Sequence, residues 1–121
     1  MNDLLSLIGR VLLSAIFIAA GVQKFFGYDG TLAYMAKYGV PGVLLPGVIA
    51  IEFFGGLAIL FGLGARLAAL ALAGFTIVAA LLFHRDFADP LMIAMFMKNL
   101  AIAGGLLLLF VYGPGRYAIR D

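Results

Sequence analysis

The sequence contains no cysteine, no tryptophan and a single histidine, His84, among its 121 residues. Without cysteine, the chain cannot form disulfide bonds, bind metals through thiolates, carry out thiol redox chemistry or attach haem covalently. Because one histidine is a poor start for a metal centre, no metal site is expected. Charged residues are also scarce, at 12% of the chain, where soluble domains average about 25%. Few side chains are therefore available for polar chemistry.

Hydrophobic residues are abundant instead, at 65% of the chain, whereas soluble domains average about 45–50%. A soluble core of this size could not bury so much apolar surface, so we expect the lipid bilayer to be the main contact of the chain. The net charge is only +2. That charge is too small and too scattered for nucleic-acid binding, so no nucleic-acid partner is expected.

Four apolar stretches are long enough to cross a bilayer, which takes about 20 mostly apolar residues in a helix. We expect these spans at about 4–26, 43–63, 66–83 and 91–112. The pattern predicts an all-α fold, a four-transmembrane-helix bundle forming a single integral membrane domain over residues 1–121. An even number of spans places both termini on one side, and the positive-inside rule favours the cytoplasm for them.

The connection between the first two predicted spans carries helix signals of its own. Asp29 or Thr31 could cap a short helix over residues 32–38, and Gly39 suits the position just past its end. We therefore expect a short interfacial helix between spans 1 and 2. The alternative is a plain loop, because isolated helices of this length are marginal.

Small residues recur on the predicted spans at a spacing of four. In a bilayer such residues allow helices to approach closely, so they favour bundling. The repeats comprise Ala15 and Ala19, then Ala65, Ala69 and Ala73, then Ala101 and Gly105, while Gly55 and Gly56 follow Glu52 on one face.

Glu52 and Lys98 are the only charged residues in the second and fourth predicted spans. A charge at the centre of a lipid-facing helix costs roughly 2.5–3.5 kcal/mol, so intramembrane charges tend to face a protein interior and mark function. Counted from the side opposite the termini, Glu52 lies about 13 Å deep and Lys98 about 10 Å deep. The matching depths predict one polar site, with Lys98 as a partner of Glu52.

Other polar residues fall in the same half of the membrane. Gln23 and Lys24 stand where the first span leaves the membrane, and His84 stands at the end of the third. Asn99 adjoins Lys98 but is rotated about 100° round the helix. Arg10 lies in the other half, yet its long side chain makes it a rival partner for Glu52. A purely structural role remains open, in which an ion pair fixes helix registry or Lys24 reaches the headgroups.

Taken together, these residues resemble the DoxX family of small four-helix membrane proteins. The first span is similar to the family's Arg-x-x-x-x-x-x-Phe and Gly-x-x-Lys opening. The next connection resembles its Gly-x-Pro turn, and the later spans resemble its Glu-x-x-Gly-Gly and Lys-Asn segments. The matching residues are Arg10 with Phe17, Gly21 with Lys24, Gly39 with Pro41, Glu52 with Gly55 and Gly56, and Lys98-Asn99 with Gly104-Gly105.

The resemblance implies a protein of the bacterial inner membrane that serves a redox system. Some members of the family are membrane subunits of a thiosulfate:quinone oxidoreductase, others are associated with oxidative-stress complexes, and many have no assigned activity. We therefore expect an accessory subunit of a quinone-linked or oxidative-stress system, without enzyme activity on its own, in contact with a partner subunit or with further copies of itself. Quinone is the expected cofactor, with Glu52 and Lys98 contacting its carbonyl oxygens or relaying protons.

Two other functions fit the same residues. In the first, the protein is a non-enzymatic assembly or scaffold protein whose intramembrane charges set how the helices pack. In the second, it is a small transporter or proton pathway. The second would need an oligomer, because one four-span protomer leaves little room for alternating access.

Overall fold

The computed structural model describes residues 2–83 and 88–118. Its helices are α1 (Asn2–Phe26), α2 (Tyr28–Lys37), the 3-10 turn η1 (Gly42–Leu44), α3 (Leu45–Phe61), α4 (Ala65–Phe83) and α5 (Pro90–Tyr112). Four helical segments of the described residues are long and apolar enough to cross a membrane. They are α1, α3 together with η1, α4 and α5. The prediction of an all-α, four-span bundle with a short helix after the first span is confirmed.

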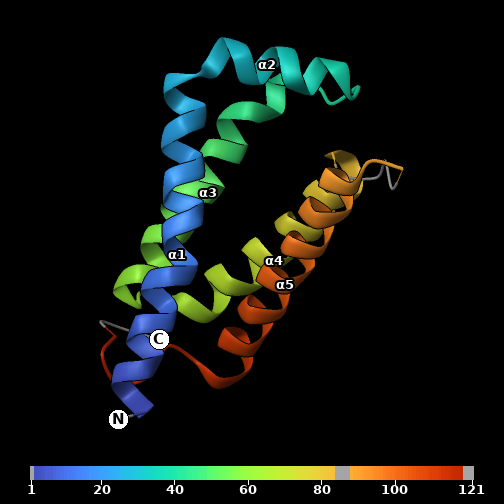
Figure 1. The fold of residues 1–121 in the computed structure, drawn as a ribbon. Coiled ribbons are helices and arrows are strands. Elements are labelled where there is room, and N and C mark those ends of the chain that lie inside the picture. Colours follow the sequence, from blue (N-terminus) through green and yellow to red (C-terminus); the bar gives the residue numbers. More distant parts are fainter. Residues whose placement is uncertain (1, 84–87, 119–121) are drawn as a thin grey trace.

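The long helices form two antiparallel pairs. Helix α1 packs along α3 and α4 packs along α5, while α3 also contacts α4, and α1 makes few contacts with α5. In Figure 1 the two pairs diverge from the lower end like the arms of a V, and α2 crosses the open upper end. The start of α1 and the segment that follows α5 both lie at the lower end (Figure 1), hereafter the termini side. The opposite end is the far side.

Helix α2 begins earlier than expected. It starts at Tyr28, with only Gly27 between it and the end of α1, and no side chain caps it. The capping role predicted for Asp29 or Thr31 is wrong, because the Thr31 hydroxyl donates 3.0 Å back to the Gly27 carbonyl. Its end follows the prediction: Gly39 has a positive φ of 74°, which glycine adopts without strain.

Close packing between the helices rests on glycines. An added Cβ on Gly21 of α1 would lie 3.0 Å from the Cβ of Phe53 on α3. An added Cβ on Gly56 of α3 would lie 2.7 Å from Cγ1 of Ile18 on α1. Gly55, one residue earlier, faces Leu72 of α4 instead. The Gly55-Gly56 pair thus lets α3 approach a neighbour on each of two faces.

The other small residues divide into two groups. Ala65, Ala69 and Ala73 are buried, as their spacing predicted. Ala15, Ala19 and Ala101 are exposed, so a packing role for them within the chain is wrong. Four-residue spacing marks a helix face without saying whether that face meets protein or lipid.

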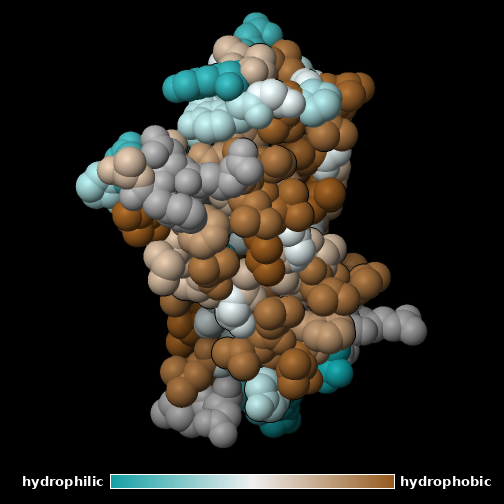
Figure 2. Space-filling view, turned by 90° about the vertical axis from the view of Figure 1, so that its right-hand side faces the viewer, coloured by the Kyte–Doolittle hydropathy of each residue, from teal (hydrophilic) through white to brown (hydrophobic). Residues whose placement is uncertain are grey.

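The outer surface is apolar over its middle. Figure 2 shows hydrophobic residues across most of one face, with hydrophilic residues gathered at its upper and lower ends. Large side chains such as Leu12, Leu67 and Val43 are exposed on this surface. Such a band matches a bilayer core, with the polar ends lying among headgroups and water.

Candidate functional site

A pocket of about 590 Å³ lies between the two helix pairs toward the far side, and we call it the interhairpin pocket. All five α-helices contribute to its walls, which are mostly apolar. Its polar and charged lining residues are Lys24, Thr31, Tyr34, Glu52, Thr76, Lys98 and Asn99. These groups therefore share one cavity, although they come from five separate helices.

Glu52 forms an ion pair with Lys24 across the α1–α3 contact. Nζ of Lys24 lies 2.7 Å from Oε1 of Glu52, and the Glu52 side chain is only 5% exposed. Oε1 is buried, and this ion pair is its polar contact among the described residues. The expected pairing of Glu52 with Lys98 or Arg10 is therefore wrong.

The backbone explains why Lys24 is the partner. Gly21 brings α1 against Phe53 of α3, next to Glu52. Lys24 follows Gly21 by three residues, which places it on the same face of α1 one turn further on. Because the two backbones are close there, a lysine at the end of α1 can reach down to a carboxylate inside α3. Its side chain is 31% exposed, so it also borders the pocket opening.

Arg10 lies outside this pocket, on the termini side. Its Nη1 donates to the carbonyls of Ile59 at 2.9 Å and Leu60 at 3.1 Å, and its Nη2 donates to the carbonyl of Tyr117. The last carbonyls of a helix have no partner within the helix and carry partial negative charge. Arg10 thus caps the C-terminal end of α3 and holds the segment around Tyr117 against it.

Lys98 and Asn99 both line the pocket, and Asn99 is the more buried of the two. Asn99 is buried, and its Nδ2 donates 3.3 Å to the carbonyl of Thr76 on α4. Lys98 is exposed and forms no ion pair within the described ranges. Since Lys24 and Glu52 neutralise each other, Lys98 is the uncompensated charge among the described lining residues.

Two predicted residues remain, and the structure describes one of them. Gln23 is exposed and absent from the walls of the pocket. His84 lies outside the described residues.

An aromatic cluster at the pocket's far-side end was not predicted. Tyr34 of α2 stacks on Phe83 of α4 with ring centroids 5.3 Å apart, and Tyr38 meets the same ring edge-on at 5.3 Å. Burial raises the pKa of Tyr34, and the neighbouring Tyr38 hydroxyl raises it further, so the Tyr34 phenol stays a neutral donor. The four-residue spacing of the two tyrosines was the available signal, because it places them on one face.

Chemically, the site combines apolar walls with a few convergent polar groups. Such a combination is typical of sites that bind small organic ligands. Ammonium and amide groups can donate to a carbonyl or anionic oxygen, and the Glu52 carboxylate can accept from a hydroxyl. The arrangement suits an amphiphile with an apolar body and an oxygen-bearing head.

Comparisons with known proteins agree with this membrane setting. A family model described as DoxX matches residues 5–85. Inner membrane protein YqjF of Escherichia coli (strain K12) is 53% identical over 119 residues, which cover 98% of this chain and 92% of that protein. Inner membrane protein YphA of the same organism is 36% identical over 126 residues, covering 98% and 89%.

A further relative comes from Bacillus subtilis (strain 168). It is named "Putative oxidoreductase CatD", and it is 32% identical over 77 residues, covering 64% of this chain and 57% of that protein. No solved structure matches the chain.

Proposed function

Because the chain belongs to the DoxX family of inner-membrane proteins, we propose that it binds a quinone in the interhairpin pocket as an accessory subunit of a membrane redox system. The system would be quinone-linked or would serve the oxidative-stress response. The chain contributes binding and orientation, while a partner redox subunit supplies the electrons.

One observation carries the proposal: three charged side chains and an amide line a single apolar pocket between helices. A quinone has an apolar ring and tail with two carbonyl oxygens. Lys98 is placed to donate to one carbonyl oxygen, and the ring and tail can lie against the apolar walls. Glu52, held by Lys24, can accept the hydroxyl proton of the reduced quinol.

The comparisons add support from a different direction. CatD carries the name "Putative oxidoreductase", and its similarity to this chain extends over 77 residues. Two observations therefore support the proposed link to redox chemistry: the lining of the pocket and the name of a relative.

A quinone titration of the purified protein in lipid nanodiscs tests the proposal. We expect native mass spectrometry to show one quinone per chain, with quinone affinity lowered about 10- to 100-fold in Lys98→Ala, the range for losing a hydrogen bond to a charged group. A parallel titration with the reduced quinol should show a similar loss in Glu52→Gln, which removes the charged acceptor for its hydroxyl. Lys37→Ala is the matched control, because it removes a charge on the same side from a residue that does not line the pocket. If Lys98→Ala binds quinone and Glu52→Gln binds quinol as the wild type does, the assignment is wrong.

A further inference from the structure

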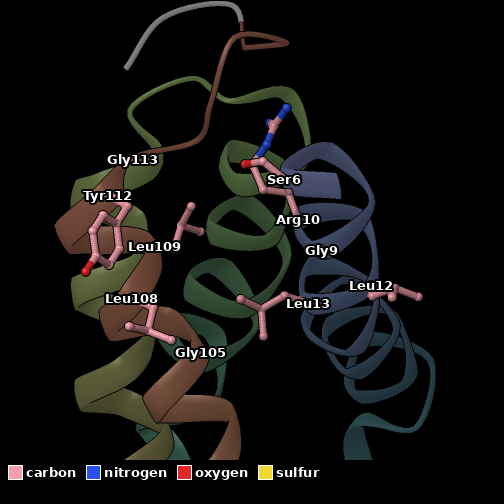
Figure 3. Close-up of a pocket in the computed structure, with 10 residues that line it drawn as sticks. All are labelled: Ser6, Gly9, Arg10, Leu12, Leu13, Gly105, Leu108, Leu109, Tyr112 and Gly113. Carbon is pink, nitrogen blue, oxygen red and sulfur yellow. The ribbon is translucent and has the colours of Figure 1, made fainter. Parts of the chain in front are cut away.

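A second cavity, of about 530 Å³, separates α1 from α5 on the termini side, and we call it the α1–α5 pocket (Figure 3). These two helices make few direct contacts, so the space between them is not filled by their own packing. Its walls are one face of each helix, and it plays no part in the proposed quinone site.

The α1–α5 pocket is polar at one end and apolar at the other. Ser6 and Arg10 line the end near the termini. Deeper in the membrane, Leu13 and Leu109 point into the gap from opposite sides (Figure 3). Ser6 and Leu13 are seven residues apart, so this gradient extends over about 10 Å of helix.

The polar end contains one buried basic side chain, Arg10, and two more arginines lie near it. Arg10 is 2% exposed, and its Nε has no hydrogen-bond partner among the described residues. The Arg66 guanidinium lies beside Gly113, with Nη2 2.8 Å from where a Cβ would stand. Arg116 is exposed in the following tail. Among the described residues at this end Asp3 is the acidic one, so basic side chains outnumber acidic side chains there.

We infer that the α1–α5 pocket binds an anionic phospholipid, with its phosphate at the Ser6–Arg10 end and an acyl chain between the leucines. Basic pockets between transmembrane helices recognise anionic headgroups in this way. The pocket extends for only about two helical turns, which suits an acyl chain entering from the headgroup level. A second copy of the chain is a poorer fit, because a transmembrane helix would need a groove along the full length of the span.

Glycine positions provide variants that fill the pocket, because an added Cβ meets no clash there. A Cβ on Gly105 would meet Leu13 at 3.8 Å, an ordinary contact, so Gly105→Leu extends into the cavity. Gly9→Leu fills it from α1, where nothing lies within 4 Å of an added Cβ. Gly104→Leu is the matched control: that position is equally open but does not line the pocket.

The test is lipid retention measured by native mass spectrometry, after equilibration with phosphatidylglycerol and phosphatidylcholine of identical chains. We expect the wild type to retain one phosphatidylglycerol with at least about fivefold preference, the effect of one basic residue near anionic lipid. Gly105→Leu and Gly9→Leu should lose this lipid, and Gly104→Leu should keep it.

Equal retention of the two lipids by the wild type would overturn the inference, as would unchanged retention in both pocket-filling variants. Thermal unfolding of each variant shows whether it is folded, and quinone binding should be unaffected by all three. Retention of a second copy of the chain instead of a lipid would also overturn the inference.

Discussion

At the scale of single residues, the Lys24–Glu52 pair has two unequal members. Glu52 is in the middle of α3, and its side chain is only 5% exposed, so an unpaired carboxylate there would be poorly solvated. Lys24 is in the last turn of α1, and its side chain could reach the headgroups if its partner were removed. Breaking a buried pair leaves an uncompensated charge, so the cost depends on which member remains.

We therefore expect Lys24→Leu to lower the free energy of unfolding by on the order of 3 kcal/mol and Glu52→Leu to lower it by less. The double variant should recover most of the loss, because no charge is then left buried. Unfolding in detergent mixtures, followed by circular dichroism, measures all four proteins of the cycle.

The same cycle separates two functions. If the pair only fixes helix registry, the double variant should fold and also bind the reduced quinol normally. Under our proposal it folds but loses quinol affinity, because the Glu52 acceptor is gone. Single-variant losses that simply add, within about 0.5 kcal/mol, would show that the two charges are not energetically coupled.

Residue pairing was the part of the site that the sequence could not predict. The depths of Glu52 and Lys98 along their spans were readable, and both residues do line one pocket. Depth says nothing about rotation round each helix or about which helices touch. The partner was decided by the Gly21–Phe53 contact, which requires knowing that α1 packs on α3. Arg10 was a candidate partner of Glu52 for the same reason, although it lies in the half of the membrane where the sequence placed it.

At the scale of the helices, the contact between α1 and α3 depends on the absence of a side chain at Gly56. An added Cβ there would lie 2.7 Å from Ile18 Cγ1 and 3.2 Å from its backbone nitrogen. The side-chain atom could shift, but the backbone nitrogen belongs to α1 itself. Even a methyl group would therefore push the two helices apart.

We expect Gly56→Ala to destabilise the fold by about 1–3 kcal/mol through overpacking. Gly74→Ala on α4 is the control, because nothing lies within 4 Å of its Cβ position and alanine favours helices by up to about 1 kcal/mol. Thermal melts in detergent compare the two variants. A Gly56→Ala protein as stable as the control would contradict close packing at this site.

Helix boundaries were more predictable than helix contacts. Long apolar runs and the glycine at position 39 are local signals, and the four spans and the end of α2 follow them. The start of α2 did not follow its capping signals, because α1 and α2 are separated by Gly27 alone. The chain turns there without a side-chain cap, so neither Asp29 nor Thr31 caps α2.

At the scale of the whole molecule, the V of Figure 1 is closed at one end and bridged at the other. On the termini side α3 connects directly to α4, and Arg10 fastens the tail to α3. On the far side, the described contact across the opening is the aromatic cluster of Tyr34, Tyr38 and Phe83. Because α2 is a short helix outside the spans, this bridge is the part of the pocket wall best able to move.

We expect quinone binding to narrow the far side of the V while the termini side stays fixed. Since the chain has no cysteine, spin labels can be placed at single introduced cysteines. The exposed positions Val43 and Leu91 report on the open end, and Leu5 and Leu67 report on the closed end. Double electron–electron resonance should show a shorter, sharper distance for the first pair only. An unchanged first pair at saturating quinone would mean that the pocket is preformed and its aromatic bridge does not move.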